Sequence, residues 1–352
     1  MRLAVENLAQ HARGCAILGT GGGGDTYASE LATRAALQQH GPVDVVTLDE
    51  LADDALILPV AGWGAPTVGI EKLGSGDEGA TLVSMAERWF GRPIDALMIG
   101  EIGGGNGVEP VGWAARLGLP LVDADGMGRA FPEGDMATMH IAGVDAAPAF
   151  FADERGNGLV ATPVDAVWLE RIARALVVAF GGAVAGADHV MDAATARGAT
   201  VLGSVTLASS IGAALDVDGL DGVLRVTDGR RLVTGTVTDV DRRTTGGFAR
   251  GTVTVDGVGE DAGRRTTIHV QNENLLAQEG DRPLAMVPDL ITICDEGTGE
   301  AIPTERVRYG QRATVIGMPC APIWRTPAGL RVGGPARFGF RHAYVPLEEL
   351  SP

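Results

Sequence analysis

Cysteine is scarce in this chain, with three residues (Cys15, Cys294 and Cys320) among 352. No two of them have the CxxC spacing of a zinc knuckle, and three scattered thiols cannot form a disulfide framework. Aromatic residues are also few, at 5%, so aliphatic side chains and alanine must fill the cores. No apolar run approaches the roughly 18–20 residues of a membrane-spanning helix. The N-terminal residues lack a signal-peptide pattern, so we expect a cytoplasmic protein without a membrane partner.

Positive charge is in short supply as well, because 28 Lys and Arg face 45 Asp and Glu, for a net charge of −17. Nucleic-acid binding depends on a basic face, so we expect no nucleic-acid partner. The acidic surface favours solubility, and an acidic small substrate stays open if a few arginines gather locally. Glycine is abundant instead, at 52 residues, which predicts tight turns and close approaches of backbone to backbone or ligand.

Apolar runs alternate with helical segments over the first half of the chain, with strand-like runs at 43–48, 55–64, 95–100 and 119–125. This alternation is typical of a mainly parallel sheet with flanking helices. Beyond about residue 221 the pattern changes to alternating apolar and polar residues punctuated by glycine, which indicates β-structure. We therefore predict an α/β protein with an N-terminal α/β domain over 1–165 and a C-terminal β-rich domain over 166–352.

Three loops fall at the carboxyl ends of predicted parallel strands, where ligands bind in open sheets. The first, GTGGGGD at 19–25, fits the GxGxxG pattern and opens a helix. Such a loop can present N–H groups to a phosphate, but the charge of Asp25 opposes one. We expect Gly22 and Gly23 to let the backbone approach a small substrate, with Asp25 as a polar contact. A turn needed only for packing is the alternative.

The second loop, GEIGGGNG at 100–107, contains Glu101 and Asn106. Glu101 ends an apolar strand. A carboxylate beside an apolar sheet must be paired with a polar partner or take part in function. Asn106 either contacts the substrate or caps the next helix, which is the common role of Asn at such a position.

The third loop, DADGMGRAFPE at 123–133, contains two carboxylates and an arginine. Asp123 and Asp125 fall at alternate positions, so they point the same way if the strand continues. Two carboxylates on one face suggest a metal ion, a shared proton or a pairing arginine, for which Arg129 is available. A structural Asp–Arg network is the alternative. His140 follows, as a base, a ligand or a structural residue.

The β-rich half offers two further candidates. Asn272 and Glu273 follow an alternating strand, as substrate contacts or as part of a polar turn. Cys320 lies in GMPCAP, between two prolines and five residues before Arg325. A thiol at a rigid strand end near a cation is where thiolate character is expected, and a buried, inert cysteine is the alternative. Cys15 and Cys294 lie within apolar runs and are predicted core residues.

Five motifs in order, LGTGGGGD, GEIGGGN, DADGMGRAFPE, HVQNENL and GMPCAP, resemble the S-methyl thiohydantoin desulfurase family, formerly a domain of unknown function associated with hydantoinases and oxoprolinases. The match runs from about residue 10 to about residue 340. The resemblance implies an N-terminal α/β domain, a C-terminal β-rich domain and an active site between them. The implied reaction is hydrolysis of an S-methyl thiohydantoin to a hydantoin and methanethiol.

Residue chemistry suggests how such a reaction would be divided. Cys320 would attack C2 of the ring as nucleophile, and Glu101 or Asp123 would handle protons. We expect the ring, or a carboxylate attached to it, to be held by the polar residues of the loops, namely Asn106, Asp125 and Arg129, with Gly22, Gly23, Asp25, Asn272 and Glu273.

Two other hypotheses stay open. In the first, a divalent metal held by Asp123, Asp125, Glu101 and His140 activates water to hydrolyse a cyclic amide; otherwise we expect no cofactor. In the second, the protein is a non-catalytic partner of a hydantoinase-type complex. The expected partner is a small cyclic substrate, and self-association into a homo-oligomer stays open.

Overall fold

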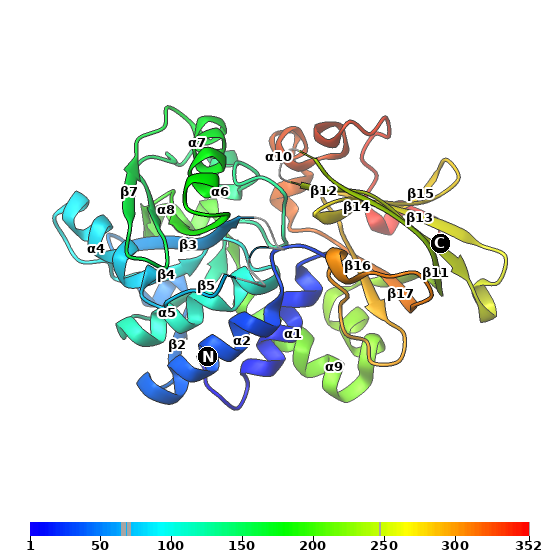
Figure 1. Ribbon diagram of the computed structural model, residues 1–352, viewed down its shortest axis with the longest axis horizontal. Helices are drawn as coiled ribbons and strands as arrows, with labels where there is room; N and C mark the ends of the chain where they lie inside the picture. Colours follow the sequence, from blue (N-terminus) through cyan, green and yellow to red (C-terminus); the bar gives the residue numbers. More distant parts are fainter. Residues whose placement is uncertain (65–67, 69–71, 246–247, 352) are drawn as a thin grey trace.

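The computed structural model describes residues 1–64, 68, 72–245 and 248–351, and it divides them between two sheets (Figure 1). The first sheet has a parallel centre in the order β2-β5-β4-β3 and antiparallel strands at both ends. The predicted α/β class is confirmed, with parallel pairing confined to this centre. The strands are β1 (Arg2–Leu3), β2 (Val43–Val46), β3 (Leu56–Gly64), β4 (Ala96–Ile99), β5 (Leu121–Asp125), β6 (Ala149–Ala152), β7 (Gly158–Ala161), β8 (Ala183–Ala187), β9 (Met191–Asp192) and β10 (Val201–Leu202).

Helices cover both faces of the first sheet, which explains why its central strands are continuous apolar runs rather than alternating ones. On β4, Leu97 and Ile99 pack in one core and Ala96 and Met98 in another, on the opposite face. Successive side chains of a strand point to opposite faces, so both sets are buried. The helices are α1 (Leu8–Leu18), α2 (Thr26–His40), α4 (Glu78–Phe90), α5 (Glu109–Leu117), α6 (Thr138–Ile141), α7 (Ala166–Ala179) and α8 (Ala193–Ala199).

The second sheet is antiparallel throughout, in the order β15-β14-β13-β12-β11-β17-β16. Its alternating apolar residues, such as Val253 and Val255, form a core of their own. Helix α10 (Pro327–Gly333) follows the last strand. The strands are β11 (Arg230–Thr245), β12 (Phe248–Gly257), β13 (Arg265–Gln271), β14 (Glu273–Glu279), β15 (Arg282–Met286), β16 (Leu290–Asp295) and β17 (Arg312–Met318).

Helix α9 (Ser204–Thr227) connects the two sheets and packs against α1 (Figure 1). The two helices approach closely at glycines: a Cβ on Gly14 would lie 1.7 Å from the carbonyl oxygen of Ala208. The first sheet draws β8, β9 and β10 from beyond residue 165, and the antiparallel sheet begins at Arg230. The division of the chain at residue 165 stays a prediction.

The glycine loop after α1 lies between the two sheets. The N–H of Asn274 donates to the oxygen of Thr20 at 2.8 Å, and the N–H of Thr304 donates to the oxygen of Gly21 at 2.8 Å. A Cβ on Gly22 would lie 1.9 Å from Oε1 of Glu273, so only glycine fits there. The loop therefore brings the second sheet onto the carboxyl ends of β3 and β4. None of the helices within the described ranges is long and apolar enough to cross a membrane.

Candidate active site

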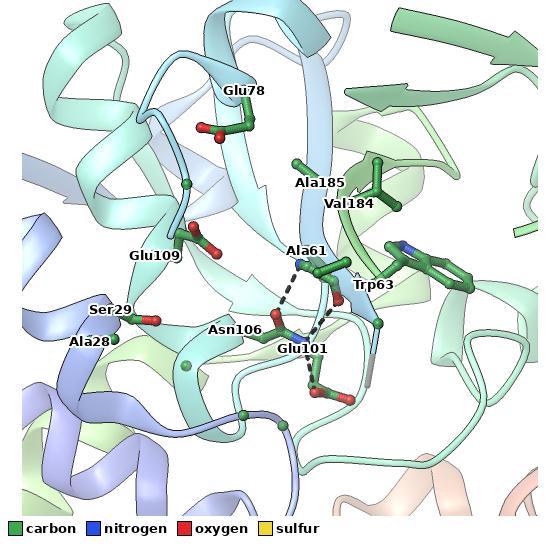
Figure 2. A pocket seen from close by; sticks show the side chains of 18 of the residues that line it. Ala28, Ser29, Ala61, Trp63, Glu78, Glu101, Asn106, Glu109, Val184 and Ala185 are labelled. Carbon is green, nitrogen blue, oxygen red and sulfur yellow. Dashed lines mark hydrogen bonds between the residues drawn. The ribbon is translucent and has the colours of Figure 1, made fainter. Parts of the chain in front are cut away.

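A cavity of about 870 Å³ lies where the glycine loop, the carboxyl ends of β3 and β4, and the start of β14 meet. Figure 2 shows Glu101, Asn106 and Glu109 grouped on one wall, beside Ala61 and Trp63 of β3. Both sheets contribute to the lining, because Asn272 and Glu273 also reach it.

Glu101 follows directly after β4 and Gly100, so the end of a buried strand delivers its carboxyl group to the cavity. The side chain is 6% exposed. One oxygen accepts a hydrogen bond from Nδ2 of Asn106 at 3.0 Å, and the other accepts one from the N–H of Phe131 at 3.1 Å. Burial raises the pKa of Glu101 to about 7, against these two bonds. A carboxyl group with that pKa both accepts and releases protons near neutral pH.

Asn106 fixes the orientation of Glu101. It lies in the short 3₁₀ turn η2 (Gly104–Gly107) and does not cap α5, whose N-cap position is Val108. Its Oδ1 accepts from the N–H of Gly62 at 2.9 Å, and its Nδ2 donates to the oxygen of Gly62 at 3.3 Å. The amide is thus held by the end of β3 while it donates to the carboxylate (Figure 2).

Glu273 brings a second buried carboxyl group to the cavity, from the other sheet. It is 2% exposed, and within the described residues its Oε2 has no hydrogen-bond partner. Burial and the neighbouring Glu101 raise its pKa well above the ordinary value, which favours the protonated form, and a protonated carboxyl group can act as a donor. Asn272 lines the cavity beside it, with φ at 56° and its Oδ1 accepting from the N–H of Ala249.

The glycine loop lines the cavity at Gly23 and Gly24, with φ at 74° and 85°. Asp25 accepts from the N–H of Tyr27 at 3.0 Å, caps α2 and pairs with Arg306. The protein's own carboxylate therefore occupies the helix start where a phosphate would bind, which disfavours the nucleotide interpretation. Gly22 contacts Glu273 and supports the cavity from behind.

Asp125 and Arg129 are fully buried and are not among the residues that line the cavity. One oxygen of Asp125 accepts from the N–H groups of Ile102, Met127 and Gly128, which fixes the loops on either side of Glu101; burial still raises its pKa to about 6. The guanidinium of Arg129 donates to protein oxygens that include those of Pro288, Asp289 and Thr20. Arg129 therefore ties the glycine loop to the segment before β16 of the second sheet, whereas Asp125 holds only loops of the first sheet.

The structure does not bring Asp123 to the cavity. Asp123 and Asp125 share a face of β5 as expected, but Asp123 accepts from the N–H and the hydroxyl of Thr206, at 2.9 and 2.5 Å, near the start of α9. His140 lies on α6, also outside the lining. Within the described ranges no three His, Cys, Asp or Glu side chains are grouped as metal ligands, so the four residues suggested for a metal do not form a site.

Cys320 also lies outside the lining of the cavity, and it is 7% exposed. Its N–H donates to Oδ1 of Asp289, which also accepts from Arg325 at 3.0 Å, and its sulfur is 3.9 Å from the hydroxyl of Tyr344. Burial, followed by the charge of Asp289, raises the pKa of Cys320 to about 12 in spite of Arg325. These surroundings disfavour the expected thiolate character. Cys15 and Cys294 are fully buried, as predicted.

The sequence patterns missed several residues that line the cavity. Glu109 is the clearest, because it follows the GEIGGGNG motif by two residues and was available from the same pattern. An acidic residue in the first turn of a helix is ordinary, so it carried no signal. The cavity is also lined by Trp63, Lys72, Glu78, Arg116 and Arg174.

Models of known protein families match the whole of this two-sheet arrangement. The model for the N-terminal domain of S-Me-THD-like proteins matches residues 6–163, and the model for their C-terminal domain matches residues 164–347. The chain belongs to the S-Me-THD-like family. The resemblance to S-methyl thiohydantoin desulfurases is thereby confirmed at the level of the family.

A crystal structure of a protein from Chromobacterium violaceum has the same fold as this S-Me-THD-like chain. The two share 28% sequence identity over 99% of this chain and 100% of that one, with a TM-score of 0.84. That protein is described by its source alone. The similarity therefore supports the fold of this chain and gives no information about its activity. Among curated proteins, none matches the chain.

Proposed function

We propose that this protein hydrolyses an S-methyl thiohydantoin to the corresponding hydantoin and methanethiol. Membership of the S-Me-THD-like family supports the ring system. The observation that carries the proposal is Glu101, a carboxyl group with a pKa of about 7 that Asn106 orients at the wall of the cavity. A group of that kind is suited to moving the protons of a hydrolysis at neutral pH.

The reaction is substitution at the isothiourea-like carbon C2 of the ring. Water attacks C2, and Glu101 in its carboxylate form takes one proton of that water as the O–C2 bond forms. The electron pair of the C2=N bond moves to the ring nitrogen, which takes up a proton. When the C2–S bond breaks, the sulfur leaves with a proton as methanethiol and the C2=O bond of the hydantoin forms.

The remaining cavity residues suit a small, flat, polar ring. In its protonated form, which burial favours, Glu273 can donate a hydrogen bond to a ring carbonyl. The backbone at Gly23 and Gly24 allows close approach because no side chain intervenes. Trp63 and Phe131 supply apolar surface to the same cavity, where a flat ring and a methylthio group would pack.

We assign the attack to water rather than to Cys320. A cysteine nucleophile must reach the substrate as a thiolate, whereas Cys320 lies outside the cavity lining and its pKa is raised to about 12. Covalent catalysis by Cys320 stays a prediction from the sequence, and its test is given below.

Product analysis with two substrates tests the proposal. S-methyl thiohydantoin should yield methanethiol and an intact hydantoin, whereas plain hydantoin should not be opened. Ring opening of hydantoin, lost on treatment with a chelator, would instead support the metal-dependent cyclic amide hydrolase. If neither compound reacts and the protein co-purifies with a hydantoinase, the non-catalytic hypothesis takes first place.

A further inference from the structure

Glu109 is a carboxyl group of the cavity without a partner. It begins α5 and lines the same cavity as Glu101. Among the residues that the structure describes, no hydrogen bond or ion pair to its carboxyl group is present. Burial raises the pKa of Glu109 to about 7, and the charge of Glu78 adds to this effect.

The surroundings place Glu109 beside the hydrogen-bonded unit of Glu101 and Asn106. A Cβ on Gly62 would lie 2.9 Å from Oδ1 of Asn106 and 3.8 Å from Oε2 of Glu109, so both side chains lie over the same glycine at the end of β3. Figure 2 shows Asn106 between Glu101 and Glu109. The two carboxyl groups thus approach one region of the cavity from opposite sides of Asn106.

We propose that Glu109 is a catalytic residue, the general acid that protonates the ring nitrogen beside C2 while Glu101 removes a proton from the attacking water. This assignment rests on the proposed hydrolysis. A structural role in the first helical turn would pair the carboxylate with a basic side chain or a backbone N–H. Glu109 faces the cavity with neither of these among the described residues.

The protons balance over one turnover. In the addition step the O–C2 bond forms, Glu101 gains a proton from water, and Glu109 gives its proton to the ring nitrogen. In the second step the hydroxyl at C2 returns a proton to Glu109, the C2–S bond breaks, and Glu101 gives its proton to the departing sulfur. Both carboxyl groups end as they began, so no further reactant is needed.

Glu273 is less suited to this role. It reaches the cavity from the second sheet, against Gly22, whereas Glu109 lies with Asn106 over Gly62 at the end of β3. The charged groups that line the cavity together with Glu109 are Asp25, Lys72, Glu78, Glu101, Arg116, Asp153, Glu154, Arg174, Asp188, Glu273 and Arg306. Lys72 is engaged by Glu154 and by two backbone oxygens. Glu78 accepts from the N–H groups of Ser75 and Gly76.

The test is the dependence of kcat/KM on pH for the hydrolysis of S-methyl thiohydantoin. The wild type should give a bell centred near pH 7, with the rising limb from Glu101 and the falling limb from Glu109. Glu109→Gln should lower kcat by on the order of 100-fold, leave KM within a few-fold, and abolish the falling limb. Glu109→Asp should keep a falling limb, because it restores an acid.

Glu296→Gln is the matched control, since it removes a glutamate that lies outside the cavity lining and is paired with Arg312. Its profile should match the wild type. If the wild type turns over the substrate and Glu109→Gln has the same pH profile, the role of Glu109 is overturned and the proposed function is not. A wild type without turnover would overturn the proposed function, and the role of Glu109 with it.

Discussion

Replacing Glu109 with Gln should stabilise the protein at alkaline pH, because the ionised carboxylate of Glu109 destabilises the folded state. The pKa of Glu109 rises from 4.5 to about 7 on folding, so the folded state binds the proton more tightly than the unfolded state does. Stability is therefore lost as pH rises from the unfolded value through the folded one. Glutamine carries no charge at any pH, so this loss is absent from the variant.

The size of the effect follows from the shift. At about 1.4 kcal/mol for each pKa unit, the advantage of the variant over the wild type should grow by about 2–3 kcal/mol between pH 5 and pH 8. For a chain of this length that is about 3–4 °C in Tm. The absolute stability of the variant at pH 5 does not matter, since the prediction concerns only how the difference changes with pH.

Thermal unfolding followed by circular dichroism at pH 5 and pH 8 measures this difference. Glu296→Gln is again the control: the hydrogen bond and charge of Arg312 lower the pKa of Glu296, so its contribution is almost complete at both pH values and its Tm difference should stay constant. Equal Tm differences for Glu109→Gln at the two pH values would refute the argument that Glu109 lies half-buried in the cavity wall without a partner.

Three further predictions concern residues whose roles the structure redefines. Asp123→Asn should cost about 1 kcal/mol of stability through its bonds to Thr206 and leave kcat intact; loss of turnover in a folded variant would return Asp123 to the site. Native protein at neutral pH should resist iodoacetamide at Cys320, and Cys320→Ala should keep most of its activity; alkylation of Cys320 with loss of turnover would establish covalent catalysis instead. Gly14→Ala should destabilise by about 3 kcal/mol, because its Cβ would lie 1.7 Å from Ala208 O, whereas Gly198→Ala has open space and should not destabilise; similar Tm values for the two would contradict the α1–α9 packing.

The fold was readable from sequence where periodicity was strong. The central strands of the first sheet are apolar runs of the right length, and the second sheet alternates apolar and polar residues. The antiparallel extension through β8 was missed because its sequence, AVAGA, has little pattern. The sequence of residues 198–215 is compatible with either a strand or a helix, because its small residues, Ala208 and Gly212, serve close packing of α9 against α1.

The site was predictable at the strand ends and less so beyond them. Glu101, Asn106 and Glu273 were identified because a polar group at the end of an apolar strand must be hydrogen-bonded, paired or involved in function. All three line the cavity. The sequence also predicted that Asp123 and Asp125 share a face of their strand. The alternation of side chains along a strand does not show which element covers that face, and in the structure it is α9. Cys320 followed the pattern of a reactive thiol, and only the fold reveals Asp289 beside it.

The central claim is that Glu101 drives hydrolysis of the S-methyl thiohydantoin ring, and the turnover of Glu101→Gln tests it most directly. Methanethiol release should fall by on the order of 1,000-fold or more relative to the wild type, while calorimetry shows the substrate still bound with a similar Kd and the Tm shows an intact fold. A folded Glu101→Gln variant that releases methanethiol at the wild-type rate would contradict the account.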